Sequence, residues 1–511
     1  MSITSVNFFI ILVLSVGIYY ILPKTCQWYA LLVYSGLFFC ASSTTVTGLY
    51  LVGSVVITWI CAKMILRYRE NKHKKAFATL ISGIIINVGI LATLKYSNFF
   101  IQNINRVLAW GGGALRFEEV KWPAPMGISF YTLMAVGYLV DSYWGTMEPS
   151  GNVLKTALFI GYYPQLISGP ITRYNEIKEQ LYSGHAFKYK NIAFGVQRIL
   201  YGVFKKIVIS SRAEILVNAI YADVEMYDGF YLWIAMFLFM VQLYTDFSGC
   251  MDIIIGASEC YGIILPENFR TPFASKTVQE YWQRWHATLG AWLKDYILYP
   301  ILRTQLWKNM TKWIKAHIGK KASKQIPSYL GMLCVWLLIG LWHGGNWKFI
   351  IGMGLWFWGC IALESVLDPY CKRLKSWLGI DESTYTWQLF QSVKVFILVS
   401  VGNVFFRMDS LRSSIHVLRL SVSHLNPWIF FDGSLAQLGI TYGDINILLI
   451  GIVILCIAGH LQNEYGSARE WIQKQFLPFR WFIWLVLFAI ILVYGNYGPE
   501  YDAASFIYGG F

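Results

Sequence analysis

Residues 78–96 read ATLISGIIINVGILATLKY, and this stretch decides the class of fold. Its nineteen positions carry one charged side chain, Lys95, and its apolar residues do not alternate with polar ones. Nineteen helical residues reach about 28 Å, close to the hydrocarbon thickness of a bilayer, which is about 30 Å. The stretch therefore predicts a transmembrane helix and not a strand of a membrane barrel.

Further apolar runs lie on both sides of this one. They cover residues 8–22, 27–42, 44–66, 125–144, 153–169, 191–209, 230–260, 329–343, 347–367, 386–405, 446–460 and 479–495. At about twenty residues per crossing, the chain should hold roughly 11 to 13 transmembrane or re-entrant helices. We predict an all-α polytopic membrane protein that forms one membrane domain over residues 1–511.

The composition excludes a soluble globular protein, since 56% of the residues are apolar and only 14% are charged. Soluble domains carry about 25% charged residues. The net charge of +14 would suggest nucleic-acid binding in a soluble protein. Here the basic residues cluster between apolar runs, so we expect no nucleic-acid partner and interpret the charge by the positive-inside rule.

Three basic clusters set the expected orientation. Their members are Lys63, Arg67, Arg69, Lys72, Lys74 and Lys75; Arg303, Lys308, Lys312, Lys315, Lys320, Lys321 and Lys324; and Lys372, Arg373 and Lys375. All three should be cytoplasmic. Since three apolar runs precede the first cluster, the N-terminus is expected outside.

His343 is the first candidate for chemistry, because an ionisable residue at membrane depth is costly to keep. It lies in LWHGGNW (341–347), at the end of the apolar run 329–343. Fifteen helical residues reach about 22 Å, so His343 should lie partway across the membrane unless the helix starts deep. On a helix Gly340 would leave space beside the imidazole, and burial would favour the neutral base. The alternative is a hydrogen-bonded histidine at an interface turn.

His286 is the second candidate, within VQEYWQRWHATLGAWLKDY (278–296). This stretch predicts a single amphipathic helix along the membrane interface, with Trp282, Trp285 and His286 on the apolar arc and Arg284 on the polar one. A core histidine bonded to a neighbour is the alternative.

Two carboxylates lie inside an apolar run, in LYTDFSGCMDII (243–254). Asp246 and Asp252 do not share a helical face unless Gly249 breaks the helix. Together with Ser248 they would line a polar cavity, bind a cation or cap half-helices. The nine cysteines lack metal-ligand spacing, and no nucleotide-binding or hydrolase motif occurs, so we expect no resident metal or cofactor.

Two histidines in apolar surroundings fit one reaction best. A neutral imidazole removes a proton from an acceptor hydroxyl, which then attacks an activated acyl group such as a thioester. A proton-coupled transporter would also place His and Asp at membrane depth, so both interpretations stand at this point.

Seven stretches, in this order, resemble the membrane-bound O-acyltransferase (MBOAT) family, in particular its alginate O-acetylation branch. They are MGISFYTLMAVGYLVDSYWG (126–145), YYPQLISGPITRYNE (162–176), LYTDFSGCMDIIIG (243–256), LPENFRTPFASKTVQEYWQRWHATLGAWLKDYILYP (265–300), LWHGGNWKFI (341–350), NVFFRMDS (403–410) and SFIYGGF (505–511). The resemblance divides the domain into N-terminal spans (1–120), a catalytic core (125–410) and C-terminal spans with a tail (411–511).

The resemblance implies a ring of helices around a central funnel or tunnel. It makes His343 the catalytic histidine and His286 the second histidine of the site. The residues expected to line the tunnel or contact substrate are Trp282, Trp285, Trp342, Asn346, Asp246, Ser248 and Arg284. Departures from the branch pattern, such as Cys250 and Met251 in FSGCMD, leave the acceptor open.

The expected function is acetyl transfer from a cytoplasmic donor, acetyl-CoA or an acyl-carrier thioester, for O-acetylation of an exported polysaccharide. A secreted or membrane-anchored acetyltransferase is the expected partner if transfer is not direct, and the bacterial cytoplasmic membrane, with its lipids, is the expected location. The alternatives are D-alanyl transfer from a carrier protein to teichoic acid, and a transporter or scaffold without chemistry of its own.

Overall fold

The computed structural model describes residues 3–112, 115–123, 125–166 and 168–497. Within these ranges the regular structure is helical, and the one β-bridge is an isolated pair, Phe269 with Trp285. The prediction of an all-α fold is confirmed. The predicted tail motif SFIYGGF (505–511) lies outside the described residues.

Eight helices of the described chain are long and apolar enough to cross a membrane. They are Val46–Arg69, His73–Trp110, Phe230–Cys260, Lys320–Gly344, Lys348–Trp377, Tyr385–Arg407, Tyr442–Tyr465 and Leu477–Tyr494. Other helices, among them the shorter apolar helix Val6–Ile21, cover most of the remaining predicted runs. The chain is a multi-pass membrane protein.

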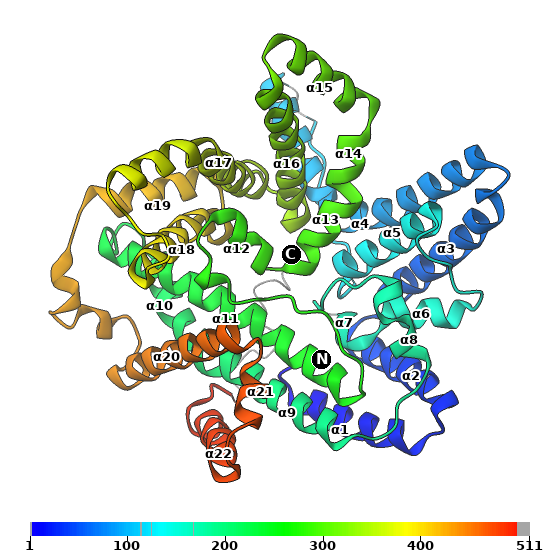
Figure 1. The fold of residues 1–511 in the computed structure, drawn as a ribbon, viewed down its shortest axis with the longest axis horizontal. Coiled ribbons are helices and arrows are strands. Elements are labelled where there is room, and N and C mark those ends of the chain that lie inside the picture. The colour runs from blue at the N-terminus through cyan, green and yellow to red at the C-terminus, as the bar shows by residue number, and fades with distance from the viewer. Residues whose placement is uncertain (1–2, 113–114, 124, 167, 498–511) are drawn as a thin grey trace. The chain divides into compact units, whose positions relative to one another are not determined.

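The backbone divides into two compact units, and the first comprises residues 1–202 and 250–266 among those described. Its helices are α1 (Val6–Ile21), α2 (Lys24–Ser42), α3 (Thr45–Arg69), α4 (His73–Trp110), α5 (Ile128–Trp144), α6 (Val153–Gly161), α7 (Tyr163–Leu166), α8 (Tyr174–Tyr182) and most of α9 (Tyr189–Val203). Helices α3, α4 and α5 pack against one another, as Figure 1 shows in blue and cyan. The end of α11 (Phe230–Cys260) completes the unit.

The second unit comprises residues 203–249 and 267–497 of the described chain. Its elements are η1 (Phe204–Ser210), α10 (Ser211–Ala222), the first part of α11, η2 (Pro272–Ala274), α12 (Val278–Arg284), α13 (Ala287–Leu293), η3 (Lys294–Leu298), α14 (Tyr299–Arg303), α15 (Gln305–His317), α16 (Lys320–Gly344), η4 (Lys348–Met353), α17 (Gly354–Trp377), α18 (Tyr385–Arg407), α19 (Leu411–Ser423), η5 (Pro427–Phe430), η6 (Ser434–Gln437), α20 (Tyr442–Tyr465), α21 (Ala468–Gln473) and α22 (Leu477–Tyr494). Helices α16, α17 and α18 pack around η4, and all the candidate site residues belong to this unit except Asp252.

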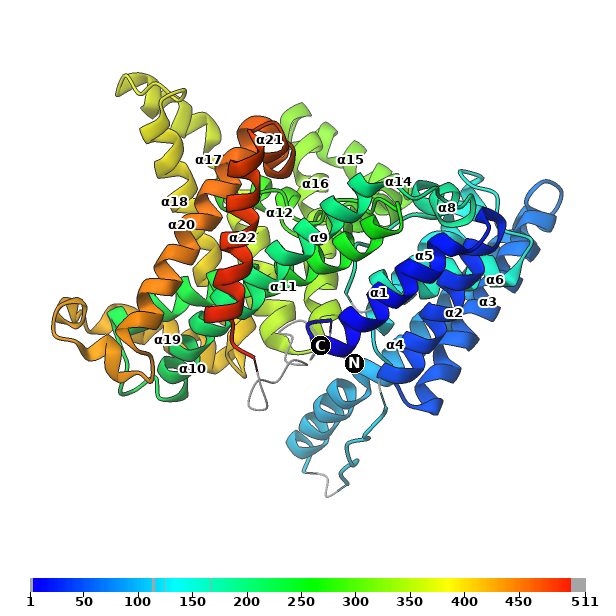
Figure 2. The same ribbon diagram turned by 90° about the horizontal axis from the view of Figure 1, so that it is seen from below.

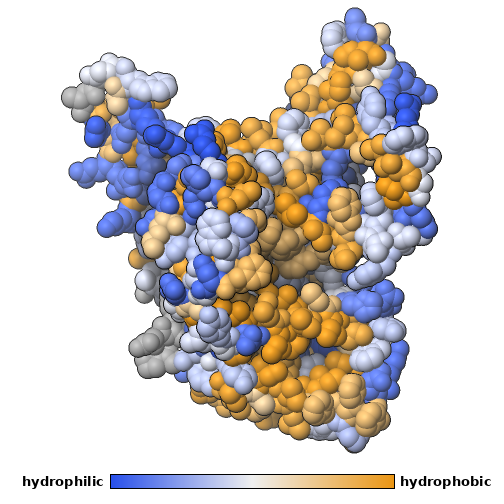
Figure 3. Space-filling model, turned by 90° about the vertical axis from the view of Figure 1, so that its left-hand side faces the viewer, coloured by the Kyte–Doolittle hydropathy of each residue, from blue (hydrophilic) through white to orange (hydrophobic). Residues whose placement is uncertain are grey.

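Exposed apolar side chains are abundant on the second unit. Helix α20 presents Leu449, Val453 and Ile457 with more than half of each side chain exposed. Figure 2 shows α20 and α22 side by side, and Figure 3 shows a broad apolar area bordered by hydrophilic residues. An apolar exterior of this kind is what a membrane protein presents to lipid.

The helix that carries His343 is longer than the sequence predicts. Helix α16 starts at Lys320 and not at residue 329, so its 25 residues span about 37 Å. The polar residues before the apolar run continue the helix through Pro327. Since this length suffices to cross the hydrocarbon layer, helix length alone does not place His343 partway across.

In the first unit, helices α9 and α11 approach each other closely at two glycines. A Cβ added at Gly195 would lie 2.5 Å from Cys260 Sγ and 2.6 Å from the Gly256 carbonyl oxygen. Real Cβ atoms do not approach other atoms this closely, so any larger residue at Gly195 must push the two helices apart.

Replacing Gly195 by Ala should therefore destabilise the protein by about 1–3 kcal/mol, despite the better helix propensity of Ala. Gly89→Ala is the matched control, because nothing lies within 4 Å of the added Cβ on α4. The melting midpoints of the purified variants in detergent measure the difference. Equal midpoints for the two variants would contradict the close packing.

Candidate functional site

His343 is the last residue but one of helix α16, and the sequence that follows turns the chain back toward it. Gly345 adopts the left-handed conformation, φ 63°, and its N–H donates to the Leu341 carbonyl at 3.1 Å. A glycine in this conformation is the common way to stop a helix. The exposed Asn346 then caps the return element η4, since its Oδ1 accepts from the Lys348 N–H at 3.1 Å. Asn346 thus shapes the turn that follows His343.

Aromatic rings enclose His343, which is 4% exposed. The imidazole centroid lies 5.0 Å from that of Trp342, 6.0 Å from that of Phe349 and 5.5 Å from that of Phe406. The predicted space beside Gly340 is absent, because a Cβ there would lie 2.4 Å from the Phe349 carbonyl oxygen. Gly340 instead lets the backbone of η4 approach α16 and bring Phe349 against the imidazole.

His286 lies at a break between two helices, and the prediction of one helix over 278–296 is wrong. Helix α12 ends at Arg284, α13 begins at Ala287, and His286 between them has φ 48° and ψ 48°. Residues 268–270 pair with 284–287 across the break, and we call this pairing the clip. The Arg270 N–H donates to the Arg284 carbonyl and the Ala287 N–H to the Asn268 carbonyl, both at 3.0 Å. These bonds replace the helical ones that the break removes.

The side chain of Asn268 fixes which nitrogen of His286 carries the proton. Its Oδ1 accepts from the Thr288 N–H at 3.2 Å and from the Thr288 hydroxyl at 2.9 Å. The same oxygen lies 3.0 Å from His286 Nδ1. An amide oxygen only accepts, so Nδ1 must donate, and the lone pair of the neutral imidazole is on Nε2.

Burial keeps His286 neutral. The residue lies outside the eight candidate spans, and desolvation lowers the pKa of its imidazole from 6.5 to about 3. A neutral imidazole with its lone pair on Nε2 is able to accept a proton.

The ring of Trp342 contacts both histidines. Its centroid lies 6.1 Å from that of His286 and 5.0 Å from that of His343. Phe247 packs edge to face on His286 at 5.1 Å. The structure thus brings the two sequence-predicted histidines, 57 positions apart in the chain, into one aromatic-walled site in the second unit.

The other predicted tryptophans support this site by packing. Trp282 lies 4.9 Å from Trp336 of α16 and 4.7 Å from Phe357 of α17, measured between ring centroids. Trp285 is 2% exposed and lies 5.0 Å from Phe269, its partner in the clip. Both rings join α12 and the clip to the rest of the second unit.

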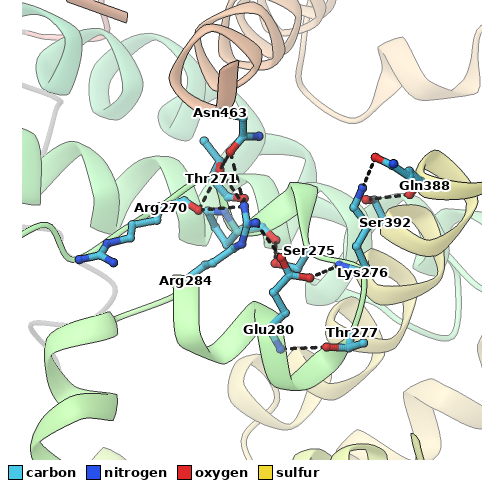
Figure 4. A network of polar contacts seen from close by, with 11 residues as sticks. Arg270, Thr271, Ser275, Lys276, Thr277, Glu280, Arg284, Gln388, Ser392 and Asn463 are labelled. Carbon is cyan, nitrogen blue, oxygen red and sulfur yellow. Dashed lines mark hydrogen bonds and ion pairs between the residues drawn. The ribbon is translucent and has the colours of Figure 1, made fainter. Parts of the chain in front are cut away.

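Arg284 belongs to a polar network that Figure 4 shows from close by. Its Nη2 lies 2.6 Å from Glu280 Oε1, and its Nη1 donates to the Thr271 hydroxyl at 3.2 Å. The network reaches α20 through Asn463 and α18 through Gln388. In the structure the guanidinium of Arg284 is engaged with the framework around the clip.

Helix α11 runs unbroken past Gly249, so its two carboxylates point to different faces, as the spacing predicts. Asp246 pairs with Lys206, and both are buried. Asp252 pairs with Arg198 at 2.9 Å within the first unit. Each carboxylate is thus matched by a cation of the chain. No group of three His, Cys, Asp or Glu residues suited to a metal ion occurs in the described chain.

Two lysines inside the apolar run 191–209 were missed by sequence reasoning. Lys206 holds Asp246, and Lys205 donates to the Ser248 hydroxyl at 2.9 Å. Both belong to η1, a π-helix, and such helices are frequent at functional sites. Two consecutive lysines within an apolar run were the available signal. Asn268, which orients His286, carried no comparable signal.

Comparison with known proteins finds one family model and several relatives that are similar to this chain. A family model described as MBOAT, membrane-bound O-acyltransferase family, matches residues 150–377, which include both histidines. A peptidoglycan O-acetyltransferase of Helicobacter pylori is 31% identical over 417 residues, covering 76% of this chain and 72% of that protein. A probable alginate O-acetylase of Azotobacter vinelandii is 28% identical over 456 residues, covering 89% and 84%. A teichoic acid D-alanyltransferase of Bacillus subtilis is 28% identical over 263 residues, covering 51% and 63%.

The depressed pKa of His286 makes a prediction for stability against pH. The unfolded state takes up a proton below pH 6.5, whereas folded His286 resists it until about pH 3. Stability should fall as the pH drops through this window, by up to about 1.4 kcal/mol per pH unit from this group. Melting midpoints between about pH 7.5 and about pH 5 should drop more for the wild type than for His286→Gln. Parallel curves for the two proteins would show that His286 does not contribute.

Proposed function

The chain belongs to the membrane-bound O-acyltransferase family and is an O-acyltransferase, and on that premise we propose that it transfers acetyl groups from a cytoplasmic thioester donor to an extracytoplasmic polysaccharide. The observation that carries the proposal is the single site in which His343 and His286 both contact Trp342. This site offers two buried imidazole bases inside a membrane protein.

His343 is the proposed general base. Its imidazole takes the proton of the acceptor hydroxyl while the oxygen attacks the thioester carbonyl. The tetrahedral intermediate then expels the thiolate, which receives a proton, and the acceptor leaves as its acetyl ester. In a second version of this step His343 itself takes the acetyl group from the thioester and passes it to the hydroxyl. The aromatic walls exclude water that would otherwise hydrolyse the thioester.

His286, which also packs on Trp342, is proposed to assist. Its proton is on Nδ1, held by Asn268, so Nε2 is the atom available to a proton or a substrate. A neutral imidazole stabilised in one tautomer and one orientation is suited to proton transfer. Asn268 Oδ1, which accepts from His286 Nδ1, plays the part that a carboxylate or carbonyl commonly plays beside a functional histidine.

The names of the relatives support acetyl as the transferred group. The alginate and peptidoglycan relatives are matched over 84% and 72% of their lengths, and the names of both describe O-acetyl transfer. The D-alanyl relative is matched over 63% of its length. We propose acetyl-CoA or an acyl-carrier thioester as donor, and a secreted or membrane-anchored acetyltransferase as partner where transfer is not direct. The proposed location is the bacterial cytoplasmic membrane with the N-terminus outside.

D-alanyl transfer from a carrier protein to teichoic acid is the second candidate, because a D-alanyltransferase is among the relatives. Mass spectrometry of envelope polymers from a deletion strain separates the two. We expect loss of acetyl esters with D-alanyl esters retained. Loss of D-alanyl esters alone would identify D-alanyl, and not acetyl, as the transferred group.

His343→Ala should lower the transfer of labelled acetyl groups to polymer by about 10²–10⁴-fold, the usual contribution of a general base. His317→Ala is the control, since His317 is exposed in α15 and stacks only on Trp313. Both variants are compared with the wild type in membranes, at equal amounts of folded protein. Full activity of His343→Ala or of His343→Gln would overturn the assignment and favour a transporter or scaffold.

A further inference from the structure

We propose that Arg284 is a positioning residue for His286: with Asn463 it holds Thr271 in a left-handed conformation and thereby fixes the clip that presents the imidazole. The activity part of this inference depends on the proposed function. The structural part, the position of His286, does not.

Two residues at the clip have a left-handed backbone: one follows its first segment directly, and the other lies in its second segment. Thr271 (φ 47°) and His286 (φ 48°) are the non-glycine residues with positive φ in the described chain. Such a conformation is a genuine outlier for a β-branched residue like threonine, because its Cβ substituents crowd the backbone. It persists only where surrounding contacts enforce it, and such residues cluster at functional sites.

The contacts that enforce it converge on the Thr271 hydroxyl. This oxygen accepts from Arg284 Nη1 at 3.2 Å and lies 2.5 Å from Asn463 Oδ1 on α20. In Figure 4 the side chains of Arg284 and Asn463 reach Thr271 from two different elements, while the guanidinium of Arg270 points away. Glu280 orients Arg284 through Nη2 at 2.6 Å.

Arg284 therefore forms hydrogen bonds with two consecutive residues, Arg270 and Thr271. Its carbonyl oxygen accepts from the Arg270 N–H at 3.0 Å, and its guanidinium holds Thr271, the next residue. A planar guanidinium reaches Glu280 and Thr271 at once, which the single ammonium of lysine does not do with the same geometry.

The consequence for His286 follows from the order of residues in the clip. Asn268 comes three positions before Thr271, and its Oδ1 accepts from His286 Nδ1. Relaxation of Thr271 to an ordinary backbone conformation redirects the segment 268–270 and draws that oxygen away from the imidazole. His286 then loses the partner that fixes its tautomer and its burial.

Chemical modification of the histidines tests the positioning directly. Diethylpyrocarbonate is applied to the full-length protein in lipid nanodiscs, and peptide mass spectrometry gives the rate for each histidine. Arg284→Gln should raise the rate at His286 by about tenfold, as expected when a strained, buried segment is released. The rate at exposed His317 should not change. Lys372→Gln is the matched control, because Lys372 forms an exposed (i, i+4) pair with Asp368 that has no contact with the clip.

A glycine at position 271 separates positioning from general stability. Glycine adopts positive φ without strain, so Arg284→Gln combined with Thr271→Gly should return the rate at His286 toward the wild-type value. Arg284→Lys should be intermediate and serves where Arg284→Gln does not fold. An unchanged rate in both Arg284 variants, or no recovery in the double variant, would overturn the inference.

The activity arm is read separately. Arg284→Gln should lower kcat for acetyl transfer while KM for the donor stays within about twofold, because the donor does not contact Arg284 in this account. A rise in KM for the donor as large as the fall in kcat would make Arg284 a substrate-binding residue and overturn its positioning role. If the wild type shows no acetyl transfer, the proposed function fails, whereas the modification rates still decide the inference.

Discussion

The site depends on one constraint: an imidazole buried among apolar side chains must remain neutral and must have its N–H hydrogen-bonded. His286 meets it through Asn268, whose amide oxygen is itself oriented by Thr288. The clip brings Asn268 to this place, and it interrupts the stretch 278–296, whose amphipathic pattern predicts one continuous helix. Around it, tryptophan and phenylalanine rings exclude water from the same region that His343 enters from α16.

Much of the fold could be predicted from the sequence, because long apolar runs between basic clusters have few structural solutions in a membrane. The start of α16 could not be predicted, because the polar residues after Lys320 favour a loop by composition and yet continue the helix. The break at His286 could not either. No glycine or proline marks it, and its cause is a pairing with residues 268–270, a tertiary contact that overrides local helix preference.

The two candidate histidines follow from the sequence and stay a prediction as functional residues, whereas the geometry that brings them together does not follow from it. His343 and His286 were identified as polar residues in apolar surroundings and by resemblance, yet nothing in their spacing indicated that Trp342 would contact both. The prediction of open space beside Gly340 is wrong, because the backbone of η4 packs closely against α16 at this glycine. Lys205 and Lys206 were missed because their partners, Ser248 and Asp246, lie about forty positions away in the sequence.

Acyl transfer is proposed to take place at the two imidazoles that pack on Trp342. The most direct measurement is an electron cryo-microscopy structure of the protein with a non-hydrolysable analogue of the thioester donor. We expect the acyl carbon of the analogue to lie within contact distance of His343, against the Trp342 ring. An acyl group bound elsewhere, with Trp342 and both histidines still packed on one another, would contradict it.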